Sequence, residues 1–301
     1  MMWGFALFFL FILFAKAYRN TFDLQISCVP VAMKASERIR TDQWLPLRIL
    51  HLSDLHMENL SVKASAIVDH LKGEPLDLIA ITGDLLDRAK NIPAAVQYVA
   101  ALQQLNPQLG TYIVFGNHDY VLPPHNLAQL KTELERIGCR VLRNQTHTLD
   151  VHGQKLHIIG IDDYATRRSD LEKSYRSVTD EGLRLVLTHD PNIVLRMKDY
   201  EYDYLLAGHF HGGQIHWPKP YHLIKMGKLP RMNIVKGLHY REGRPFYISE
   251  GLGQTGLNFR LRSRPEITVH ILQPQPLPEH QAVRLEQAKA QPEAAPTWAL
   301  E

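Results

Sequence analysis

The sequence predicts an α/β (α+β) protein in which two sheets pack face to face and helices cover their outer faces. Residues 47–137 alternate apolar, β-favouring runs with amphipathic segments, as in parallel strands joined by helices. From about residue 146 to residue 272 short strands predominate, which favours a second sheet. A chain of 301 residues can bury a core of the required size.

The composition narrows the class of protein without naming a function. The hydrophobic and charged fractions, 45% and 22%, are ordinary for a globular protein. The net charge is only +3, and no stripe of Lys and Arg interleaved with aromatic residues argues for nucleic acid. Cys28 and Cys139 are far apart and lack metal-type spacing, so we expect no disulfide framework, and a reducing compartment is permitted. The sixteen histidines are unusual, because several fall at the ends of predicted strands.

The first 15 residues are apolar and uncharged, and they predict an N-terminal helix. A membrane-spanning helix needs about 20 apolar residues, with a lower limit near 17. We interpret residues 1–20 as an uncleaved membrane anchor. A signal peptide or a shallow interfacial segment is the alternative, although a basic leading region is absent. Positive residues follow the apolar run and place the main domain on the cytoplasmic face: Lys16, Arg19, Lys34, Arg38 and Arg40.

The spacing of apolar residues predicts the helices and strands of the first half of the domain. Residues 21–46 are expected to form a linker with an edge strand that leads into the domain. Strands are predicted at 47–52, 77–81 and 111–115, and helices at 62–71, 92–105 and 127–137. Gly138 follows the last helix in the position that favours a left-handed helix end.

The second half contains shorter strands. They are predicted at 146–151, 156–161, 183–187, 204–207, 245–249 and 266–272, with a hairpin turn at 152–155. We therefore place a catalytic domain at residues 47–272. Residues 273–301 are rich in Pro, Gln, Ala and Glu and predict a disordered tail.

Metal-type ligands follow the ends of five predicted strands. The motifs are Asp54-x-His56, Gly83-Asp84, Gly116-Asn117-His118-Asp119, His189 and Gly208-His209-x-His211. All of these ligands are oxygen or imidazole donors, which suit Zn, Mn or Fe better than Cu or Ca. Residues two apart at a strand end point to the same side, so Asp54 and His56 can reach one ion. Two cations need a shared carboxylate, and we assign that place to Asp84.

Each motif alone also has a purely structural interpretation. Asp54-x-His56 could be a surface turn, and His189 could begin a helix with Pro191 in its first turn. His209 and His211 could be solvated in a glycine-rich loop. Asp87 and Asp119 could be turn or cap residues. Because all five motifs fall at strand ends, we favour one shared metal centre.

These motifs, with Gly83-Asp84-x-x-Asp87, together resemble the signature of calcineurin-like metallophosphoesterases across residues 47–272. Residues 188–191, 208–214 and 264–268 resemble the bacterial membrane-associated phosphodiesterase branch, which is related to UDP-2,3-diacylglucosamine pyrophosphatase-type enzymes. The resemblance implies a four-layer αββα sandwich of two mixed sheets, with the active site at one edge of the paired sheets.

The resemblance also implies a role for each residue around two divalent cations (Mn, Zn or Fe). The first metal would be held by Asp54, His56 and His211, the second by Asn117, His189 and His209, and Asp84 would bridge them. A metal-bridging hydroxide would attack phosphorus. His118 would act as general acid or stabilise charge, Asp119 would orient it through a hydrogen bond, and Asp87 would support the centre from outside. Glu250 departs from the Arg that this branch often has, so contacts to substrate phosphate are expected to differ.

The expected substrate is a phosphodiester or pyrophosphate, and the apolar N-terminus suggests a lipid-linked one such as a nucleotide-diphospho-lipid. The basic and apolar segment 221–230 could rest on lipid headgroups, cap the site, or be an ordinary loop. A nucleotide phosphodiesterase that is merely tethered is the alternative enzyme, and an inactive metal-binding scaffold is the alternative class. No nucleic acid and no obligate protein partner is expected.

Overall fold

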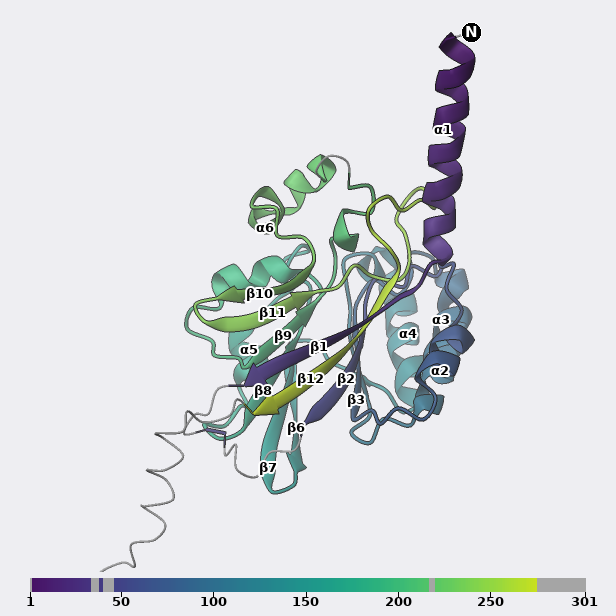
Figure 1. Ribbon diagram of the computed structural model, residues 1–301. Coiled ribbons are helices and arrows are strands. Elements are labelled where there is room, and N and C mark those ends of the chain that lie inside the picture. The colour runs from purple at the N-terminus through teal and green to yellow at the C-terminus, as the bar shows by residue number, and fades with distance from the viewer. Residues whose placement is uncertain (1, 34–37, 40–45, 217–219, 275–301) are drawn as a thin grey trace, which may run out of the picture.

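The computed structural model describes residues 2–33, 38–39, 46–216 and 220–274, and Figure 1 shows two sheets packed against each other. The first sheet has the order β1-β12-β2-β3-β4-β5. Its strands are β1 (Gln25–Met33), β12 (Glu266–Pro274), β2 (Leu47–Leu52), β3 (Leu78–Thr82), β4 (Thr111–Val114) and β5 (Arg140–Val141). β12 is antiparallel to β2, whereas β2 to β5 run parallel, so the sheet is mixed as expected.

The second sheet is also mixed and has the order β10-β11-β9-β8-β7-β6. Its strands are β10 (Gly237–Arg241), β11 (Arg244–Ile248), β9 (Tyr204–Ala207), β8 (Leu183–Leu187), β7 (Gln154–Gly160) and β6 (Gln145–Val151). The outer pairs, β10 with β11 and β6 with β7, are antiparallel hairpins, and the four inner strands β11, β9, β8 and β7 run parallel to one another.

Alternating side chains assign each sheet an inner and an outer face. Ile49 and Leu78 of the first sheet share one buried cluster with Leu185 and Leu206 of the second. The residues next to them along the strands point the other way, as the two-residue period of a strand requires. Leu50, for example, packs in the separate cluster beneath the helices. The core therefore lies both between the sheets and beneath the outer helices.

Helices form the two outer layers. The first sheet is covered by α2 (Ala64–Leu71), α3 (Ile92–Leu102) and α4 (Pro124–Arg136), whose apolar faces join its outer side. Shorter elements contribute to the cluster on the second sheet, among them α5 (Leu171–Tyr175), η6 (Pro191–Arg196), η8 (Tyr221–Met226) and α6 (Lys228–Arg231). Further short helices among the described residues are η1 (Asn20–Phe22), η3 (Ala89–Asn91), η4 (Gln103–Leu105), η5 (Asp119–Val121) and η7 (His211–Gly213).

Most predicted elements are found at or within three residues of their expected bounds. The strands at 47–52, 183–187 and 204–207 have the predicted limits. Sequence reading missed β5, which has two residues, and β10, an edge strand without a fully buried residue. Neither contains enough buried positions to produce a two-residue period. β12 continues two residues past the predicted domain end, and residues 275–301 of the predicted tail lie outside the described residues.

The N-terminal helix is present as α1 (Met2–Arg19), but the predicted membrane anchor and its cytoplasmic-face localisation are wrong. Among the described residues, the helices are all too short or too polar to cross a membrane. The 18 residues of α1 rise about 27 Å, below the ~30 Å of a hydrocarbon core, and Lys16 and Arg19 occupy the last turn. That end is also held by the domain, because the Arg260 amide donates to the Ala17 carbonyl at 2.9 Å.

Candidate metal centre

The predicted ligands meet where the parallel strands of both sheets end. Asp54 and His56 follow β2, Asp84 follows β3, and Asn117 and His118 follow β4. From the second sheet, His189 follows β8, and His209 and His211 follow β9. The carboxyl ends of parallel strands are where open α/β sheets bind ligands. A cavity of about 400 Å³ opens over this edge and is lined by Asp84, Asn117, His118, His209 and His211, among others.

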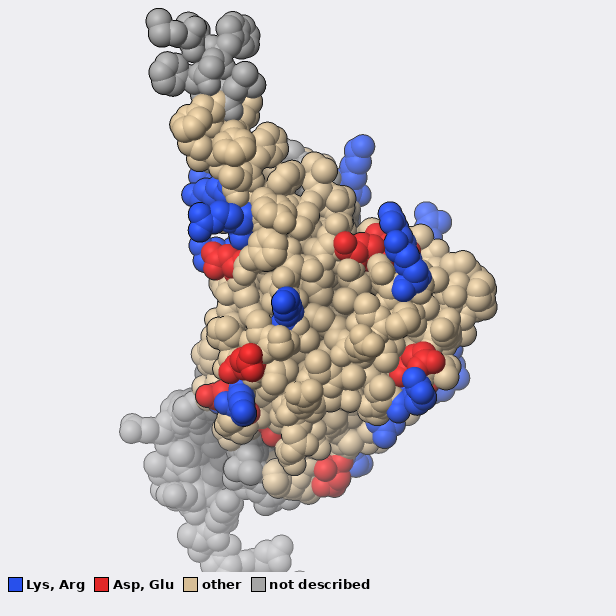
Figure 2. Space-filling view, turned by 90° about the vertical axis from the view of Figure 1, so that its right-hand side faces the viewer, with Lys and Arg blue, Asp and Glu red and all other residues tan. Residues whose placement is uncertain are grey.

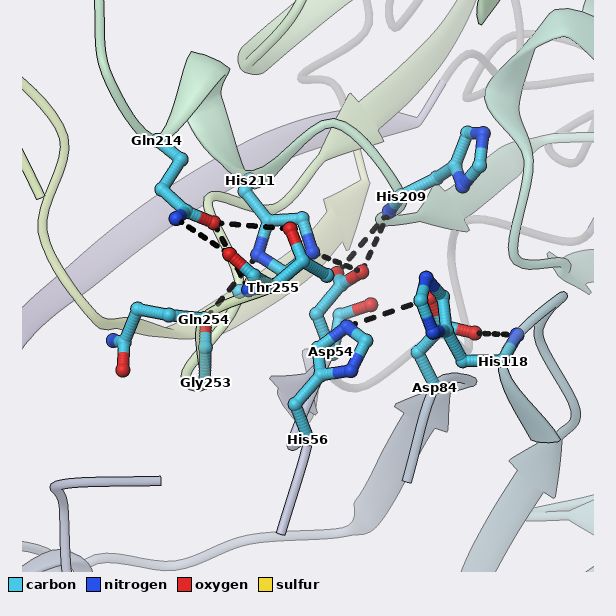
Figure 3. A network of polar contacts seen from close by, with 12 residues as sticks. Asp54, His56, Asp84, His118, His209, His211, Gln214, Gly253, Gln254 and Thr255 are labelled. Carbon is cyan, nitrogen blue, oxygen red and sulfur yellow. Dashed lines mark hydrogen bonds and ion pairs between the residues drawn. The ribbon is translucent and has the colours of Figure 1, made fainter. Parts of the chain in front are cut away.

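One group of potential ligands consists of Asp54, His56 and His211, whose ligand atoms all lie within 4.8 Å of one another. The His211 Nε2 atom lies 3.4 Å from Asp54 Oδ1. All three side chains are buried, and Figure 3 shows them together beside Asp84. These are the residues expected to hold the first cation.

A second group consists of Asp84, His189 and His209. The Asp84 Oδ2 atom lies 3.0 Å from His189 Nε2, and His189 Nε2 lies 3.1 Å from His209 Nδ1. Asp84 also belongs to a third group, with His56 and His118, and its Oδ2 atom lies 3.5 Å from His56 Nε2. Asp84 is therefore the carboxylate placed between the two sets of histidines.

Hydrogen bonds on the far side of the rings orient three of these histidines. His189 Nδ1 lies 2.7 Å from the Thr82 carbonyl oxygen, and His211 Nδ1 lies 3.2 Å from that of Gly253. A carbonyl oxygen can only accept, so each Nδ1 carries a proton and it is Nε2 that faces the site, where it can bind a cation once it is unprotonated. His56 Nδ1 lies 3.2 Å from Asp87 Oδ1. Such outer contacts are typical of imidazoles that bind metals.

The backbone is strained at the same residues. Five of the predicted ligands have positive φ: Asp54 (53°), His56 (39°), Asp84 (53°), His209 (75°) and His211 (49°). Residues other than glycine seldom adopt this conformation, and it costs about 1–3 kcal/mol at each position. Strain of this kind persists where the surrounding structure enforces it, and it clusters at functional sites.

Two glycines explain why the motifs contain Gly before a ligand. A Cβ atom on Gly116 would lie 2.2 Å from Asp84 Oδ1, and one on Gly208 would lie 2.3 Å from Asp54 Oδ2. Any larger residue would displace the carboxylates. Glycine precedes Asn117 and His209 in the sequence because the backbone at Gly116 and Gly208 lies directly against the carboxylates of Asp84 and Asp54.

Burial and charge set the protonation states of several candidate ligands. Burial alone would raise the pKa of Asp84, but the His189 ring, with His56 and His118, holds it well below its usual range. Burial lowers the pKa of His209 to about 3 and that of His211 well below its usual value. Ionised carboxylates and neutral imidazoles are the forms that bind metal. His189 differs, because burial opposes its charge but the Asp84 carboxylate raises its pKa well above the usual value, so a cation would have to displace its proton.

The donors present fit divalent cations. Among the described residues, two polar atoms in the site are buried without a hydrogen-bond partner, His56 Nε2 and Asn117 Oδ1. An unpaired buried polar atom costs about 1–3 kcal/mol, and a bound cation would remove that cost. The donor set of oxygens and imidazole nitrogens matches the cations expected from sequence.

His118 is held by a different residue from the one expected. The predicted hydrogen bond from Asp119 is wrong, because His118 Nδ1 lies 3.0 Å from Asp87 Oδ1 instead. The four backbone amides that donate to the Asp119 carboxylate, at 2.9–3.3 Å, are those of Asp84, Leu85, Leu86 and Gly116. Asp119 therefore shapes the loop that carries Asp84.

The electrostatic setting of His118 favours the protonated ring. Burial opposes the charge, but the hydrogen bond to Asp87 and the charge of Asp84 outweigh it and raise the pKa of His118 to about 9. The side chain is 30% exposed and lines the cavity, so the ring can reach a bound ligand. Leu223 and Met226, from the segment expected to rest on headgroups or cap the site, contribute to the wall of the same cavity.

Arg260 is a site residue that the sequence analysis missed. Its fully buried guanidinium donates to the carbonyl oxygens of Glu250, Gly251, Gly253 and Arg264 at 2.7–3.0 Å. The Gly253 carbonyl is the same group that His211 Nδ1 contacts. Arg260 has no ligand-type neighbour in the sequence that would mark it, so only the fold reveals this link.

Glu250, which replaces the expected Arg, is buried with only 8% exposure. Its Oε1 atom accepts from Lys236 Nζ at 2.6 Å, and the side chain packs against Gly212 beside His211. The carboxylate is thus paired with a cation behind the loop that carries the histidines.

The fold and the clustered donors define a metal-dependent hydrolase of phosphoric esters, and sequence comparison agrees. The profile of the family described as calcineurin-like phosphoesterase matches residues 47–213. The chain belongs to this family.

Three proteins with similar sequences have names that refer to this kind of chemistry. An uncharacterized metallophosphoesterase YkoQ of Bacillus subtilis is 55% identical over 85% of this chain and 93% of its own length. The phosphodiesterase YaeI of Escherichia coli is 30% identical, over 76% of this chain and 83% of its own. The UDP-2,3-diacylglucosamine pyrophosphatase LpxG of Chlamydia muridarum is 26% identical, over 74% and 82%.

Proposed function

We propose that the chain hydrolyses a phosphodiester or pyrophosphate at a centre of two divalent cations. Asp54, His56 and His211 would hold one cation, Asn117, His189 and His209 the other, and Asp84 would bridge them. The observation that carries this proposal is the position of Asp84, whose Oδ2 atom lies 3.0 Å from His189 Nε2 and 3.5 Å from His56 Nε2. A carboxylate between two sets of imidazoles is what a pair of cations requires.

When bound, two such cations stabilise phosphoryl charge and lower the pKa of water. The chain's own residues supply the rest. His118 faces the cavity and is protonated at neutral pH, so it can donate a proton to the oxygen that leaves phosphorus. Asp87 holds the His118 ring from the opposite side, through Nδ1. The Asp84 carboxylate is fixed because the His118 amide donates to its Oδ1 atom at 2.8 Å.

The test is turnover of bis-p-nitrophenyl phosphate by purified protein reloaded with Mn²⁺, Zn²⁺ or Fe²⁺. We expect hydrolysis that a chelator abolishes and added cation restores. A protein that binds two equivalents of cation yet hydrolyses neither this diester nor a pyrophosphate would be a metal-binding scaffold, and the proposal would be abandoned.

We further propose that the substrate is lipid-linked, such as a nucleotide-diphospho-lipid. Support comes from the LpxG relative, which is named a UDP-2,3-diacylglucosamine pyrophosphatase, and from an apolar cavity next to the site. The competing substrate is a nucleotide phosphodiester without a lipid, in keeping with the name of the YaeI relative. Hydrolysis of a nucleotide-diphospho-lipid in detergent is to be compared with that of the same nucleotide diphosphate ester lacking acyl chains. A preference for the chain-free ester would support the competitor.

A further inference from the structure

A second cavity, of about 870 Å³, lies between α1 and the loops that follow the site histidines. Phe9 and Leu13 of α1 form one wall, and Ile215 and Leu261 contribute from the loops. Phe9, Leu13 and Lys16 follow one another at helical spacing, so a single face of α1 is turned toward the cavity, and Asn20 of η1 continues the lining. The lining thus changes from apolar to polar toward the C-terminal end of α1.

α1 is held in this position by specific contacts. The Arg260 amide donates to the Ala17 carbonyl at 2.9 Å, and Asn20 Nδ2 donates to the Arg260 carbonyl at 2.9 Å. The rings of Phe14 and Phe259 lie 5.5 Å apart. The cavity is therefore bounded by docked elements on both sides.

The second cavity adjoins the candidate metal centre. Ile215 lines both cavities, and it is 41% exposed. It is fixed by a bridge to Leu261, supported by the His216 amide, which donates to the Leu261 carbonyl at 2.9 Å. A ligand with its phosphorus near Asp84 could pass over Ile215 and continue along α1.

Charge distinguishes the polar end of the cavity. Four basic side chains line it, Lys16, Lys236, Arg262 and Arg264, together with one carboxylate, Glu250. Lys236 pairs with Glu250 at 2.6 Å, and Arg264 pairs with Asp23 at 3.2 Å, so both of these cations have a carboxylate partner. Figure 2 shows basic side chains gathered at the base of α1. An excess of positive charge beside an apolar wall fits a ligand that has both an anionic group and an apolar chain.

We propose that this cavity is a binding site for the apolar chain of an anionic, amphiphilic phosphoester, whose phosphoryl group reaches the metal centre past Ile215. The inference rests on the proposed function for the identity of the reacting group. The inference adds where the apolar chain of the ligand binds. Leu13 and Ile215 would contact this apolar chain and favour longer ones, and Lys16 would contact an anionic group of the ligand.

The kinetic test uses the full chain loaded with Mn²⁺ and a series of alkyl p-nitrophenyl phosphodiesters, from methyl to dodecyl, below their critical micelle concentrations. We expect kcat/KM to rise on the order of tenfold or more from butyl to octyl, because buried methylenes favour binding. Leu13→Gln should flatten this dependence, measured relative to the methyl ester of the same variant. Ile12→Gln is the matched control, because Ile12 lies on the same helix, is 47% exposed and does not line the cavity.

A binding measurement keeps the test decisive if no ester is hydrolysed. Titration calorimetry with dodecyl phosphate should show binding that Leu13→Gln and Lys16→Gln each weaken several-fold, whereas Ile12→Gln and Arg19→Gln do not. Such binding without any hydrolysis would refute the proposed function and leave the cavity assignment standing. Equal chain-length dependence in Leu13→Gln and the unmodified protein, or dodecyl phosphate affinity that is the same in all variants, would overturn the cavity assignment.

Discussion

His118 Nδ1 lies 3.0 Å from Asp87 Oδ1, and the same oxygen atom lies 3.2 Å from His56 Nδ1. One carboxylate thus orients both a candidate metal ligand and the candidate proton donor. Its hydrogen bonds to His118 and His56 hold the pKa of Asp87 well below its usual range, so it stays ionised. The position of the candidate proton donor is therefore linked to the candidate metal centre through a residue that is not itself among the candidate ligands.

Asp87→Asn should move the alkaline limb of the pH–rate profile to lower pH. The pKa of His118 is raised to about 9, so the ring is protonated below that value and loses its proton as pH rises through it. Without the Asp87 charge that pKa falls, and we expect the limb to move about one to three pH units lower. The measurement is kcat against pH with a dialkyl phosphodiester, whose alkoxide leaving group needs the proton, with cation content determined in parallel. An unchanged limb at full cation content would contradict this role.

His118→Gln should slow substrates with poor leaving groups more than those with good ones. An alkoxide needs a proton as it leaves, whereas p-nitrophenolate does not. General acid catalysis contributes about 10²–10⁴-fold, and most of that should be lost for alkyl leaving groups. The ratio of kcat for an alkyl ester to that for a p-nitrophenyl ester reports the effect. Equal losses for both would mean that His118 acts by charge alone.

Asp84→Asn should lower both cation content and turnover by orders of magnitude, since the amide removes the negative charge shared by the two groups of histidines. Metal analysis by mass spectrometry after gel filtration and turnover of bis-p-nitrophenyl phosphate give the two readouts. Asp69→Asn, an exposed position on α2, is the matched control and should change neither. Full activity in Asp84→Asn would exclude a bridging carboxylate.

Arg260→Gln should destabilise the fold and weaken cation binding together. The substitution removes the charged donor of four carbonyl hydrogen bonds, although the Glu266 amide still donates to Gly251 and His211 Nδ1 to Gly253, and we expect a loss of about 3 kcal/mol. It also releases Gly253, whose carbonyl orients His211. Chemical unfolding gives the stability, and Mn²⁺ calorimetry gives the affinity. Arg260→Lys, which keeps a cation but too few donors, should recover only part of both, and full recovery would argue against the role of the carbonyl contacts.

The stability of the metal-free protein should fall in mild acid because of two histidines buried between the sheets. Burial lowers the pKa of His51 to about 3 and that of His270 well below its usual value. The unfolded chain therefore binds protons below about pH 6.5 that the folded chain does not, and stability decreases as pH falls from that point. Each histidine should cost about 2 kcal/mol between pH 6.5 and pH 5.

Urea unfolding in the presence of a chelator measures this dependence. Glutamine at either position keeps a hydrogen bond to the neighbouring Thr82 or Tyr204 hydroxyl without titrating. His51→Gln and His270→Gln should each make the decline shallower. If the free energy of unfolding of both variants fell with pH as steeply as that of the unmodified protein, the acid sensitivity would arise from other residues.

Sequence reading was strongest where one pattern repeats. Buried strands such as 183–187 show continuous apolar runs, and their ends are marked by Asp, His or Asn, so both the sheets and the candidate ligands could be predicted. It was weakest where a property depends on contacts between distant segments. Asp119 follows His118 in the chain, yet η5 begins there and turns its carboxylate toward the Asp84 loop. The apolar N-terminus suggested a membrane anchor, whereas the described helix is too short for one and its end docks on Arg260.

By itself the sequence determined the family, the two-sheet architecture and the residue types at the strand ends, because strand periodicity and metal chemistry are local properties. Only the tertiary structure decided which carboxylate holds His118, how Arg260 supports His211, and where α1 forms a cavity beside the site. These relationships join segments such as α1 and residues 250–264, more than two hundred positions apart. Their contacts depend on how the sheets pack, and no local pattern in the sequence contains that information.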